Sequence, residues 1–236
     1  MRIIFLNAWH GKAWLKLQKF ILKESRQTDI FCFSEVNPPL SERISENLSG
    51  YRILLEKLIR VNYLGGVTEG QTIILKDSSD VLSSGKEFTY EVSPNDAGCL
   101  QYANISLNGT DFWIGNIHGM AQPAHKLDIP ERIAQSQRII NFFSDKRGPK
   151  IIGGDFNLMP QTRSVAMFKE AGYRNLISEF EIKDTRGKLN HRQFKKNDLQ
   201  MFADYVFVTP DVKVKNFQVP DVEISDHLPL ILDFEI

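Results

Sequence analysis

The chain has 236 residues, of which 42% are hydrophobic and 25% charged, and its 29 Lys and Arg residues balance its 29 Asp and Glu residues. This composition is typical of a globular protein, and the length fits one domain, which we expect to span residues 1–236. The zero net charge argues against a protein that binds nucleic acid through a general positive field, so any such contact has to come from a local patch.

Apolar runs and amphipathic stretches alternate in the first half of the chain. Residues 2–9 and 28–35 are compact apolar runs, which predict buried strands. Between them, large apolar residues recur at helical spacing and predict a helix over residues 13–27. The other elements expected in this half are a short helix at 40–48 and strands at 51–58, 71–76, 86–92, 100–108 and 110–118, the last three as a meander.

The second half contains helix boundaries that the sequence marks clearly. Pro130 stands at a suitable first helical position for a helix over residues 130–144. Thr162 as a cap and Gly172 as a stop delimit a helix over residues 162–171. Strands are expected at 150–156, 203–210, 212–219 and 227–236. Strand–helix–strand units mixed with hairpins predict an α/β fold with mixed sheets, and two sheets packed face to face with helices outside account for strands this apolar.

The two cysteines, Cys32 and Cys99, lie far apart in the sequence. This usage argues against a disulfide framework and fits a reducing compartment. The apolar start of the chain is too short for a signal peptide, and no apolar run reaches the length of a membrane span. We therefore expect a cytoplasmic protein without a membrane span, and a monomer.

Polar residues occur where the predicted strands end or begin. Asn7, Glu35, His118 and Asp155 each close an apolar run, whereas Asp204 and the Ser225–His227 triplet open one. If the later strands run antiparallel to the earlier ones, their starts share an edge with the other strands' ends. Such an edge is the expected place for a site in an open α/β architecture. The predicted rim consists of Asn7, Glu35, His118, Asp155, Asn157, Asp204, Asp226 and His227.

Asp155 and Asn157 are two residues apart, so in an extended segment both face one pocket while Phe156 points into the core. Taken alone, an acid and an amide after a strand are more often turn residues. Together with the other rim residues, they favour catalysis.

Several carboxylates at close range are unfavourable unless a cation offsets their charge. Oxygen ligands select a hard ion, so we expect Mg²⁺ or Mn²⁺, and the absence of paired cysteines and of an HExxH motif argues against zinc. A hard divalent ion beside histidines suits attack by water on a phosphate ester. The sequence therefore predicts a metal-dependent phosphoesterase.

Six motifs in order carry a resemblance to a known family: "LNAW" at 6–9, "SE" at 34–35, "GNIH" at 115–118, "GGDFN" at 153–157, "ADYVFV" at 203–208 and "SDHLPL" at 225–230. Together they resemble the endonuclease/exonuclease/phosphatase superfamily, the DNase-like metal-dependent phosphohydrolases. The resemblance extends from residue 7 to residue 230. It implies a four-layer α/β sandwich with two central mixed β-sheets flanked by helices.

The resemblance also implies a metal site and a catalytic centre. Glu35 is implied as a metal ligand, with Asn7 and Asp226 close to the metal or the scissile phosphate. The first motif, "LNAWHG", departs from the commoner threonine–tryptophan–asparagine order, which leaves the role of His10 open. The implied catalytic residues are Asp155, which orients or activates water, Asn157, which helps to hold the phosphate, Asp204, which pairs with His227, fixes its tautomer and favours its charged form, and His118, a second phosphate-facing histidine.

The run "RGKLNHRQFKK" at 186–196 carries five Lys or Arg residues, of which Arg186, Lys188 and Arg192 are candidates for substrate binding. Such a run is usually a solvated loop, but it can also grip a polyanion, since Arg and Lys contact phosphates. The leading hypothesis is a phosphodiesterase or nuclease acting on DNA or RNA. The alternatives are a phosphatase or phosphodiesterase for a small-molecule or lipid-linked phosphate and, less favoured, a non-catalytic binding domain on the same fold.

Overall fold

Two mixed six-stranded sheets form the centre of the protein. The computed structural model describes residues 1–61, 67–90, 99–107, 109–193 and 199–236. The first sheet has the order β11 (Lys213–Gln218), β12 (Leu230–Glu235), β1 (Arg2–Asn7), β2 (Ile30–Val36), β4 (Val67–Lys76) and β3 (Tyr51–Val61). The second has the order β5 (Asp80–Glu87), β6 (Leu100–Leu107), β7 (Thr110–His118), β8 (Lys150–Asp155), β10 (Asp204–Val208) and β9 (Arg174–Asn175).

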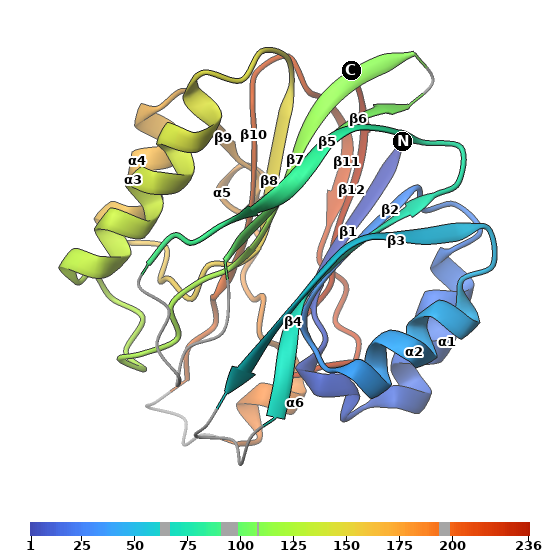
Figure 1. Cartoon of the computed structure of the whole chain (residues 1–236). Coiled ribbons are helices and arrows are strands. Elements are labelled where there is room, and N and C mark those ends of the chain that lie inside the picture. Colours follow the sequence, from blue (N-terminus) through green and yellow to red (C-terminus); the bar gives the residue numbers. More distant parts are fainter. Residues whose placement is uncertain (62–66, 91–98, 108, 194–198) are drawn as a thin grey trace.

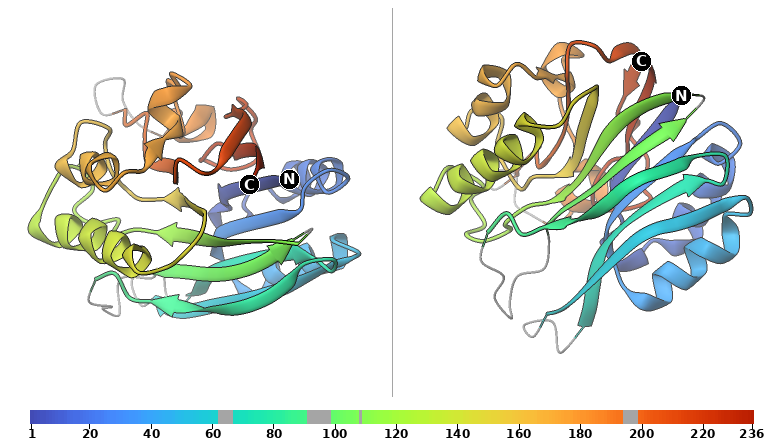
Figure 2. Two further views of the ribbon diagram at one scale, coloured as in Figure 1. Left: turned by 90° about the horizontal axis from the view of Figure 1, so that it is seen from above. Right: turned by 45° about the horizontal axis from the view of Figure 1, so that its top comes forward.

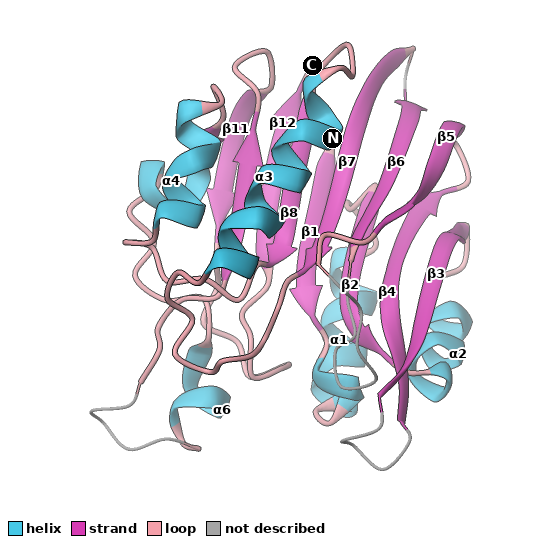
Figure 3. Ribbon diagram, turned by 60° about the vertical axis from the view of Figure 1, so that its left-hand side comes forward, coloured by secondary structure: helices cyan, strands magenta, loops and turns pink. Residues whose placement is uncertain are grey.

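Helices cover the outer face of each sheet (Figure 1). The first sheet is flanked by α1 (Trp14–Glu24) and α2 (Pro38–Asn47), and the second by α3 (Pro130–Ser144) and α4 (Arg163–Glu170). The layers can be followed from two further sides in Figure 2 and by secondary structure in Figure 3. The described residues also form three short helices: η1 (Trp9–Gly11), α5 (Leu176–Glu179) and α6 (Gly187–His191). The four-layer α/β sandwich with two mixed sheets is confirmed.

Both faces of the central strands are buried, which explains their continuous apolar runs. In β1, Ile3 and Phe5 belong to the core between the sheets, whereas Ile4 and Leu6 belong to the core under α1 and α2. The sheets approach closely at Gly153 of β8, where an added Cβ would lie 2.7 Å from the Phe5 ring. The tight packing of the two sheets therefore depends on the absence of a side chain at this position.

Strand register brings the predicted rim together. In the first sheet, β1 runs parallel to β2 with Asn7 opposite Ser34, and β12 runs antiparallel to β1. In the second sheet, Asp155 of β8 lies beside His118 of parallel β7 and Asp204 of antiparallel β10. The carboxyl ends of β1, β2, β7 and β8 thus share an edge with the amino ends of β10 and β12, as the sequence predicted.

Several element boundaries differ from the prediction. The strand predicted at 86–92 is wrong, because β5 spans Asp80–Glu87; residues 91 and 92 lie outside the described residues. β5 is an edge strand whose side chains are all exposed or partly exposed, so no apolar run marks it. The first strand ends at Asn7 rather than at residue 9, because Trp9 and His10 adopt positive φ and begin η1.

Both predicted boundaries of α4 are found as expected. Thr162 caps α4 by accepting a hydrogen bond from the Val165 amide, and Gly172 follows the helix with φ of +90°. Cys32 and Cys99 are buried and form no disulfide. Within the described ranges, no helix combines the length and apolarity that a bilayer crossing requires.

Candidate active site

Asn7 connects the two sheets at the rim. Its Nδ2 donates to Glu35 Oε1 at 2.9 Å and to Asp155 Oδ2 at 3.0 Å, so one amide group orients a carboxylate from each sheet. Its Oδ1 accepts from the backbone N–H of Trp9 at 3.1 Å, which fixes the turn after β1. Asn7 is 1% exposed, so these hydrogen bonds are made away from bulk water. The structure therefore places Asn7 where it positions both acidic groups.

His227 lies between two buried carboxylates. Its Nδ1 is 2.9 Å from both carboxylate oxygens of Asp204, and its Nε2 is 3.7 Å from Asp155 Oδ2. The Arg186 guanidinium donates through Nη1 to Nε2 at 2.5 Å. Because a guanidinium can only donate, Nε2 must be the bare nitrogen, and Nδ1–H donates to Asp204. The predicted Asp204–His227 pair is thus present with a defined tautomer.

The charge state of this cluster follows from burial and its neighbours. Burial and the Arg186 charge lower the pKa of His227 to about 4, so the imidazole is neutral at neutral pH, and the implied charged form is wrong. Burial and the Asp155 charge raise the pKa of Asp204 well above its usual value. Burial alone would also raise the pKa of Asp155, but His227, which becomes charged at acidic pH, together with Lys126, His118 and Arg186 outweighs burial and lowers that pKa. Asp155 is therefore the ionised carboxylate of the cluster.

Asn157 reaches the site by a different route from the one expected. Its φ is +54°, so the segment after β8 is not extended, and the two-residue alternation does not apply. Its backbone N–H donates to Asp155 Oδ1 at 2.9 Å, and its side-chain Nδ2 donates to the Gly119 carbonyl at 3.1 Å. Phe156 is fully buried against Phe168 and Phe207, as predicted, and anchors the turn.

Lys126 is a site residue that was not predicted. Its Nζ donates to Asn157 Oδ1, and the residue is 8% exposed. Burial lowers the pKa of Lys126 to about 8 although the Asp155 charge acts to raise it. The loop that carries it is held by Arg132, whose guanidinium donates to the carbonyls of Ala121, Pro123 and Leu127. Lys126 lies in a loop without periodicity, so no pattern could mark it.

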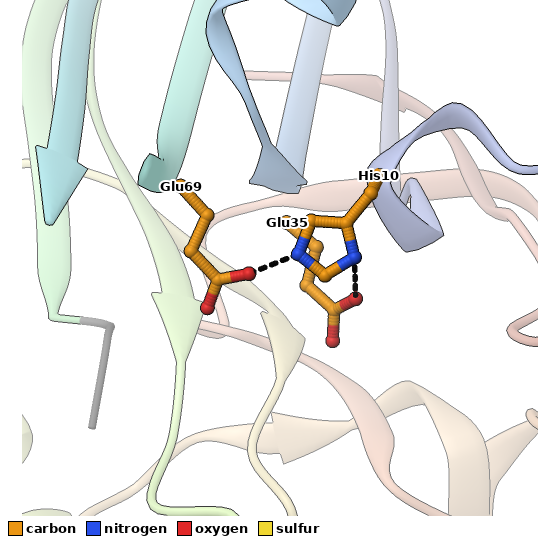
Figure 4. Close-up of side chains that lie close together, drawn as sticks. All are labelled: His10, Glu35 and Glu69. Atoms are coloured by element: carbon orange, nitrogen blue, oxygen red, sulfur yellow. Dashed lines mark hydrogen bonds and ion pairs between the residues drawn. The ribbon is translucent and has the colours of Figure 1, made fainter. Parts of the chain in front are cut away.

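A second cluster lies beside the first and contains His10, Glu35 and Glu69 (Figure 4). His10 Nε2 is hydrogen-bonded to Glu69 Oε2, and Nδ1 lies 3.3 Å from Glu35 Oε2. Burial opposes a charge on His10, but the Glu69 hydrogen bond and the Glu35 charge outweigh it and raise the pKa of the imidazole. Glu69 was not predicted as a site residue, because the strand predicted at 71–76 begins after it, whereas β4 begins at Val67 and includes it.

His118 and Asp226 complete the predicted rim. His118 Nε2 is 3.9 Å from Glu35 Oε1, and Asp226 Oδ2 is 3.6 Å from Arg186 Nη2. All eight rim residues are therefore gathered at one edge, although their individual roles stay predictions. Of the six non-glycine residues with positive φ among those described, five lie at this site: Trp9, His10, Glu35, Lys126 and Asn157. Unfavourable backbone conformations cluster at functional sites, where the surrounding structure holds them.

The three basic candidates for substrate binding differ in position. Arg186 contacts His227 and is part of the site. Lys188 Nζ lies 2.6 Å from Asp221 Oδ2, and Arg192 Nη2 lies 2.5 Å from Glu223 Oε1, so acidic partners offset both charges. The solvated loop that the run suggested is partly helical: residues Gly187–His191 form α6, in which Gly187 and Asn190 are buried. Residues 194–196 of the basic run lie outside the described ranges.

The donor groups fit a divalent ion. Among the residues that the structure describes, two groups of side chains have ligand atoms within 4.8 Å of one another: His10, Glu35 and Glu69, and Asp155, Asp204 and His227. The second group already has cationic neighbours in Lys126 and Arg186, which reduce its need for a metal. The first has two carboxylates and one imidazole, with Glu35 21% exposed. The Glu35 end of the rim is therefore the better match to a cation.

Comparison with known proteins agrees with this architecture. The chain matches the model of the Endonuclease/Exonuclease/phosphatase family over residues 4–227. No curated protein matches it. Solved structures with this fold include a mannosyl-6-phosphatase from Bacteroides thetaiotaomicron, with 16% identity, TM-score 0.78 and full coverage of both chains.

Two eukaryotic structures are also similar. TDP2 from D. rerio, solved with a single-strand DNA product, has 14% identity and TM-score 0.75, and the match covers 100% of this chain and 99% of that one. The human Nocturnin catalytic domain has 18% identity and TM-score 0.71, with 100% and 93% covered. At such identities these likenesses show the fold. Because the family match covers nearly the whole chain, the protein belongs to the endonuclease/exonuclease/phosphatase family of phosphoesterase hydrolases, which generally depend on a divalent metal ion.

Proposed function

We propose that the protein is a metal-dependent phosphodiesterase that cleaves DNA or RNA by in-line attack of an activated water. The observation that carries this proposal is the set of contacts among Asp155, His227 and Asp204, next to a carboxylate cluster suited to a cation. An ionised buried carboxylate beside a neutral imidazole is the arrangement that acid–base chemistry on water requires.

Asp155 is assigned to the attacking water. Its carboxylate is held ionised, and hydrogen bonds from Asn7 and the Asn157 amide fix its orientation. A fixed, charged carboxylate can align a water molecule and accept its proton. Asp204 holds Nδ1–H of His227, so Nε2 is the nitrogen that can exchange a proton with an oxygen of the substrate once the substrate draws the Arg186 guanidinium away from it.

Phosphate binding is assigned to the groups that can donate around this centre. Four such groups converge there: Arg186, Asn157, His118 and Lys126, the last of which was not predicted. All except Asn157 carry or can carry positive charge. Mg²⁺ or Mn²⁺ held by Glu35, with Asn7 and Asp226 nearby, would neutralise charge on the phosphoryl oxygens. The fixed cations of the chain add to that stabilisation, because their positions need no rearrangement during the reaction.

A small-molecule or lipid-linked phosphate is the second candidate substrate. The ion pairs of Lys188 with Asp221 and of Arg192 with Glu223 favour it, because paired cations contribute little to polyanion binding. The prediction that Lys188 and Arg192 bind the phosphates of a nucleic acid is therefore weakened. A purely binding role for the domain is disfavoured by the complete set of rim residues.

We further infer a single domain over residues 1–236, because both sheets contribute side chains to one core and to one rim. A monomeric cytoplasmic enzyme is the corresponding cellular form. The buried thiols of Cys32 and Cys99, which form no disulfide, support a reducing compartment.

A substrate panel tests the proposal. Purified protein with Mg²⁺ or Mn²⁺ is incubated with single- and double-stranded DNA, RNA, nucleotides, sugar phosphates and phospholipids, with Asp155→Ala as the control. Cleavage of a nucleic acid should weaken steeply as salt rises, whereas cleavage of a small phosphate should change little. The absence of any released product from the whole panel would contradict the proposal, and preference for a small phosphate would support the second candidate.

A further inference from the structure

His10 and Glu69 lie next to Glu35, and neither residue was among the predicted rim residues. They come from η1 and β4, and Glu35 from β2, so three separate elements meet there (Figure 4). The Glu69 side chain is 4% exposed and that of His10 17% exposed. Burying two carboxylates against one imidazole is costly unless positive charge lies among them.

We propose that His10 is a nitrogen ligand, through Nδ1, of the divalent cation that Glu35 binds, and that Glu69 is the outer carboxylate that orients the imidazole. This inference rests on the proposed function in one respect, namely that Glu35 holds a cation. It assigns a mixed nitrogen–oxygen ligand set to a site for which oxygen ligands alone were expected.

The separation of the two inner ligand atoms supports the proposal. His10 Nδ1 and Glu35 Oε2 are 3.3 Å apart. Adjacent ligands of an octahedral ion, each about 2.1 Å from it, are about 3.0 Å apart, so one ion can contact both atoms with little movement of either side chain. Glu35 Oε1 is engaged by the Asn7 amide, which leaves Oε2 as the oxygen that faces His10.

The outer hydrogen bond supports it as well. The contact between His10 Nε2 and Glu69 Oε2 requires a proton on Nε2, because a carboxylate at this position accepts. A neutral imidazole of this tautomer presents the bare Nδ1 lone pair to Glu35, and two electron-rich atoms at that distance need a proton or a cation between them. Carboxylate–histidine–metal arrangements of this kind are common, and the outer carboxylate fixes the tautomer and ring orientation.

The backbone is built to present the imidazole. Trp9, His10 and Gly11 have φ values of +47°, +52° and +72°, so three successive residues adopt the left-handed region. Gly11 packs on Leu40, where an added Cβ would lie 2.8 Å from a side-chain methyl. A conformation this unfavourable persists only where surrounding contacts hold it, and here it turns His10 toward Glu35 and Glu69.

An imidazole ligand changes the expected metal preference. Carboxylates alone suit Mg²⁺, whereas one nitrogen ligand strengthens binding of Mn²⁺ and of later divalent ions. We therefore expect the protein to bind Mn²⁺ more tightly than Mg²⁺. His118 is the competing nitrogen donor, because its Nε2 lies 3.9 Å from Glu35 Oε1. The test therefore compares the two histidines directly.

Pulsed electron paramagnetic resonance of bound Mn²⁺ provides a readout that is independent of activity. The full chain, labelled with ¹⁵N-histidine, is titrated with Mn²⁺ as wild type, His10→Gln, His118→Gln, Glu69→Gln and Glu35→Gln, with circular dichroism to confirm folding. The wild type should show coupling to a histidine nitrogen. His118→Gln should retain the coupling, and His10→Gln should lose it and bind Mn²⁺ roughly tenfold or more weakly, while Glu69→Gln should keep it with affinity lowered roughly tenfold.

The outcomes separate this inference from the proposed function. Coupling that persists in His10→Gln and disappears in His118→Gln overturns the assignment of His10. Bound Mn²⁺ that depends on Glu35 but shows no histidine coupling overturns the assignment as well and leaves the metal-dependent function standing. A wild-type protein that binds no Mn²⁺ overturns both.

Discussion

Asp155 and Asp204 occupy directly opposed positions on antiparallel β8 and β10, and His227 contacts both carboxylates. Each Asp is 2% exposed, so the two acids interact in a region of low dielectric. Their pKa values move in opposite directions: positive neighbours lower that of Asp155, whereas burial and the Asp155 charge raise that of Asp204. Two carboxylates with diverging pKa values can serve different roles, one on the water and one on the histidine.

Asp155→Asn should abolish turnover while the protein stays folded. The amide cannot accept a proton from water, so kcat should fall by roughly 10²–10⁴-fold. Steady-state kinetics measures the loss, and thermal denaturation followed by circular dichroism checks the fold. Asp145→Asn is the matched control, because it makes the same acid-to-amide change at a side chain that is 73% exposed and does not belong to the site. Turnover retained in Asp155→Asn would remove Asp155 from the mechanism.

Asp204→Asn should lower kcat much more than it changes KM. Asp204 accepts Nδ1–H of His227, and an amide at this position can instead donate to Nδ1 and reverse the tautomer. The reversed imidazole would present Nε2–H in place of a lone pair. Nitrogen chemical shifts of His227 measured by NMR should report this exchange, and an unchanged tautomer with reduced kcat would count against this explanation.

The location of the site was predictable because strand ends are visible in sequence. Asn7, Glu35, His118 and Asp155 follow apolar runs, and parallel strands in an α/β sheet end on one edge. The structure confirms that placement through the register of β7, β8 and β10. The edge strand β5 was predicted too far toward the C-terminus, because an exposed edge strand needs no apolar run to mark it.

The contributions of Lys126, Glu69 and His10 were not predictable from pattern. Lys126 lies in a loop that Arg132 holds through backbone carbonyls, and loop conformation has no sequence period. Glu69 lies inside a strand, where an acidic residue usually faces solvent, and only the tertiary structure shows that it meets His10. The φ of Asn157 likewise depends on tertiary contacts, so its alternation with Asp155 failed although its location was right.

Lys126 should give the reaction a pH dependence above neutrality. Burial lowers its pKa to about 8, so the ammonium is charged below pH 8 and loses its charge as the pH rises through that value. If the charge binds phosphate, kcat/KM should fall between pH 7 and pH 9. Lys126→Met should remove this inflection and lower kcat/KM roughly tenfold or more, whereas Lys126→Arg should remove the inflection and keep the charge. Identical pH profiles for wild type and Lys126→Met would exclude the role.

Removal of divalent ions should inactivate the enzyme reversibly. Glu35 and its neighbours carry more negative than positive charge without a cation, so chelation should stop turnover and added Mg²⁺ or Mn²⁺ should restore it. Metal binding to the folded state should also raise the midpoint of thermal unfolding, with a stabilisation of about 2.7 kcal/mol at a metal concentration of 100 Kd. Glu35→Gln should lose both effects at concentrations that saturate the wild type, whereas full activity in chelator would rule out a metal requirement.

Gly154→Ala should destabilise the protein strongly and disturb the site. Gly154 has φ of +123°, and an added Cβ would lie 2.3 Å from the Ile117 carbonyl oxygen on neighbouring β7. Residues in this conformation cost about 1–3 kcal/mol when they carry a side chain, and a clash with backbone adds a comparable amount. The matched control is Gly172→Ala, where φ is +90° and nothing lies within 4 Å of the added Cβ. Chemical denaturation should therefore show that the free energy of unfolding falls by about 1–2 kcal/mol in the control and by about 3–5 kcal/mol in Gly154→Ala.

Because β7 and β8 carry His118 and Asp155, Gly154→Ala should also lose activity at temperatures where it stays folded. Equal stability of the two variants would show that the strands can separate to admit the methyl group.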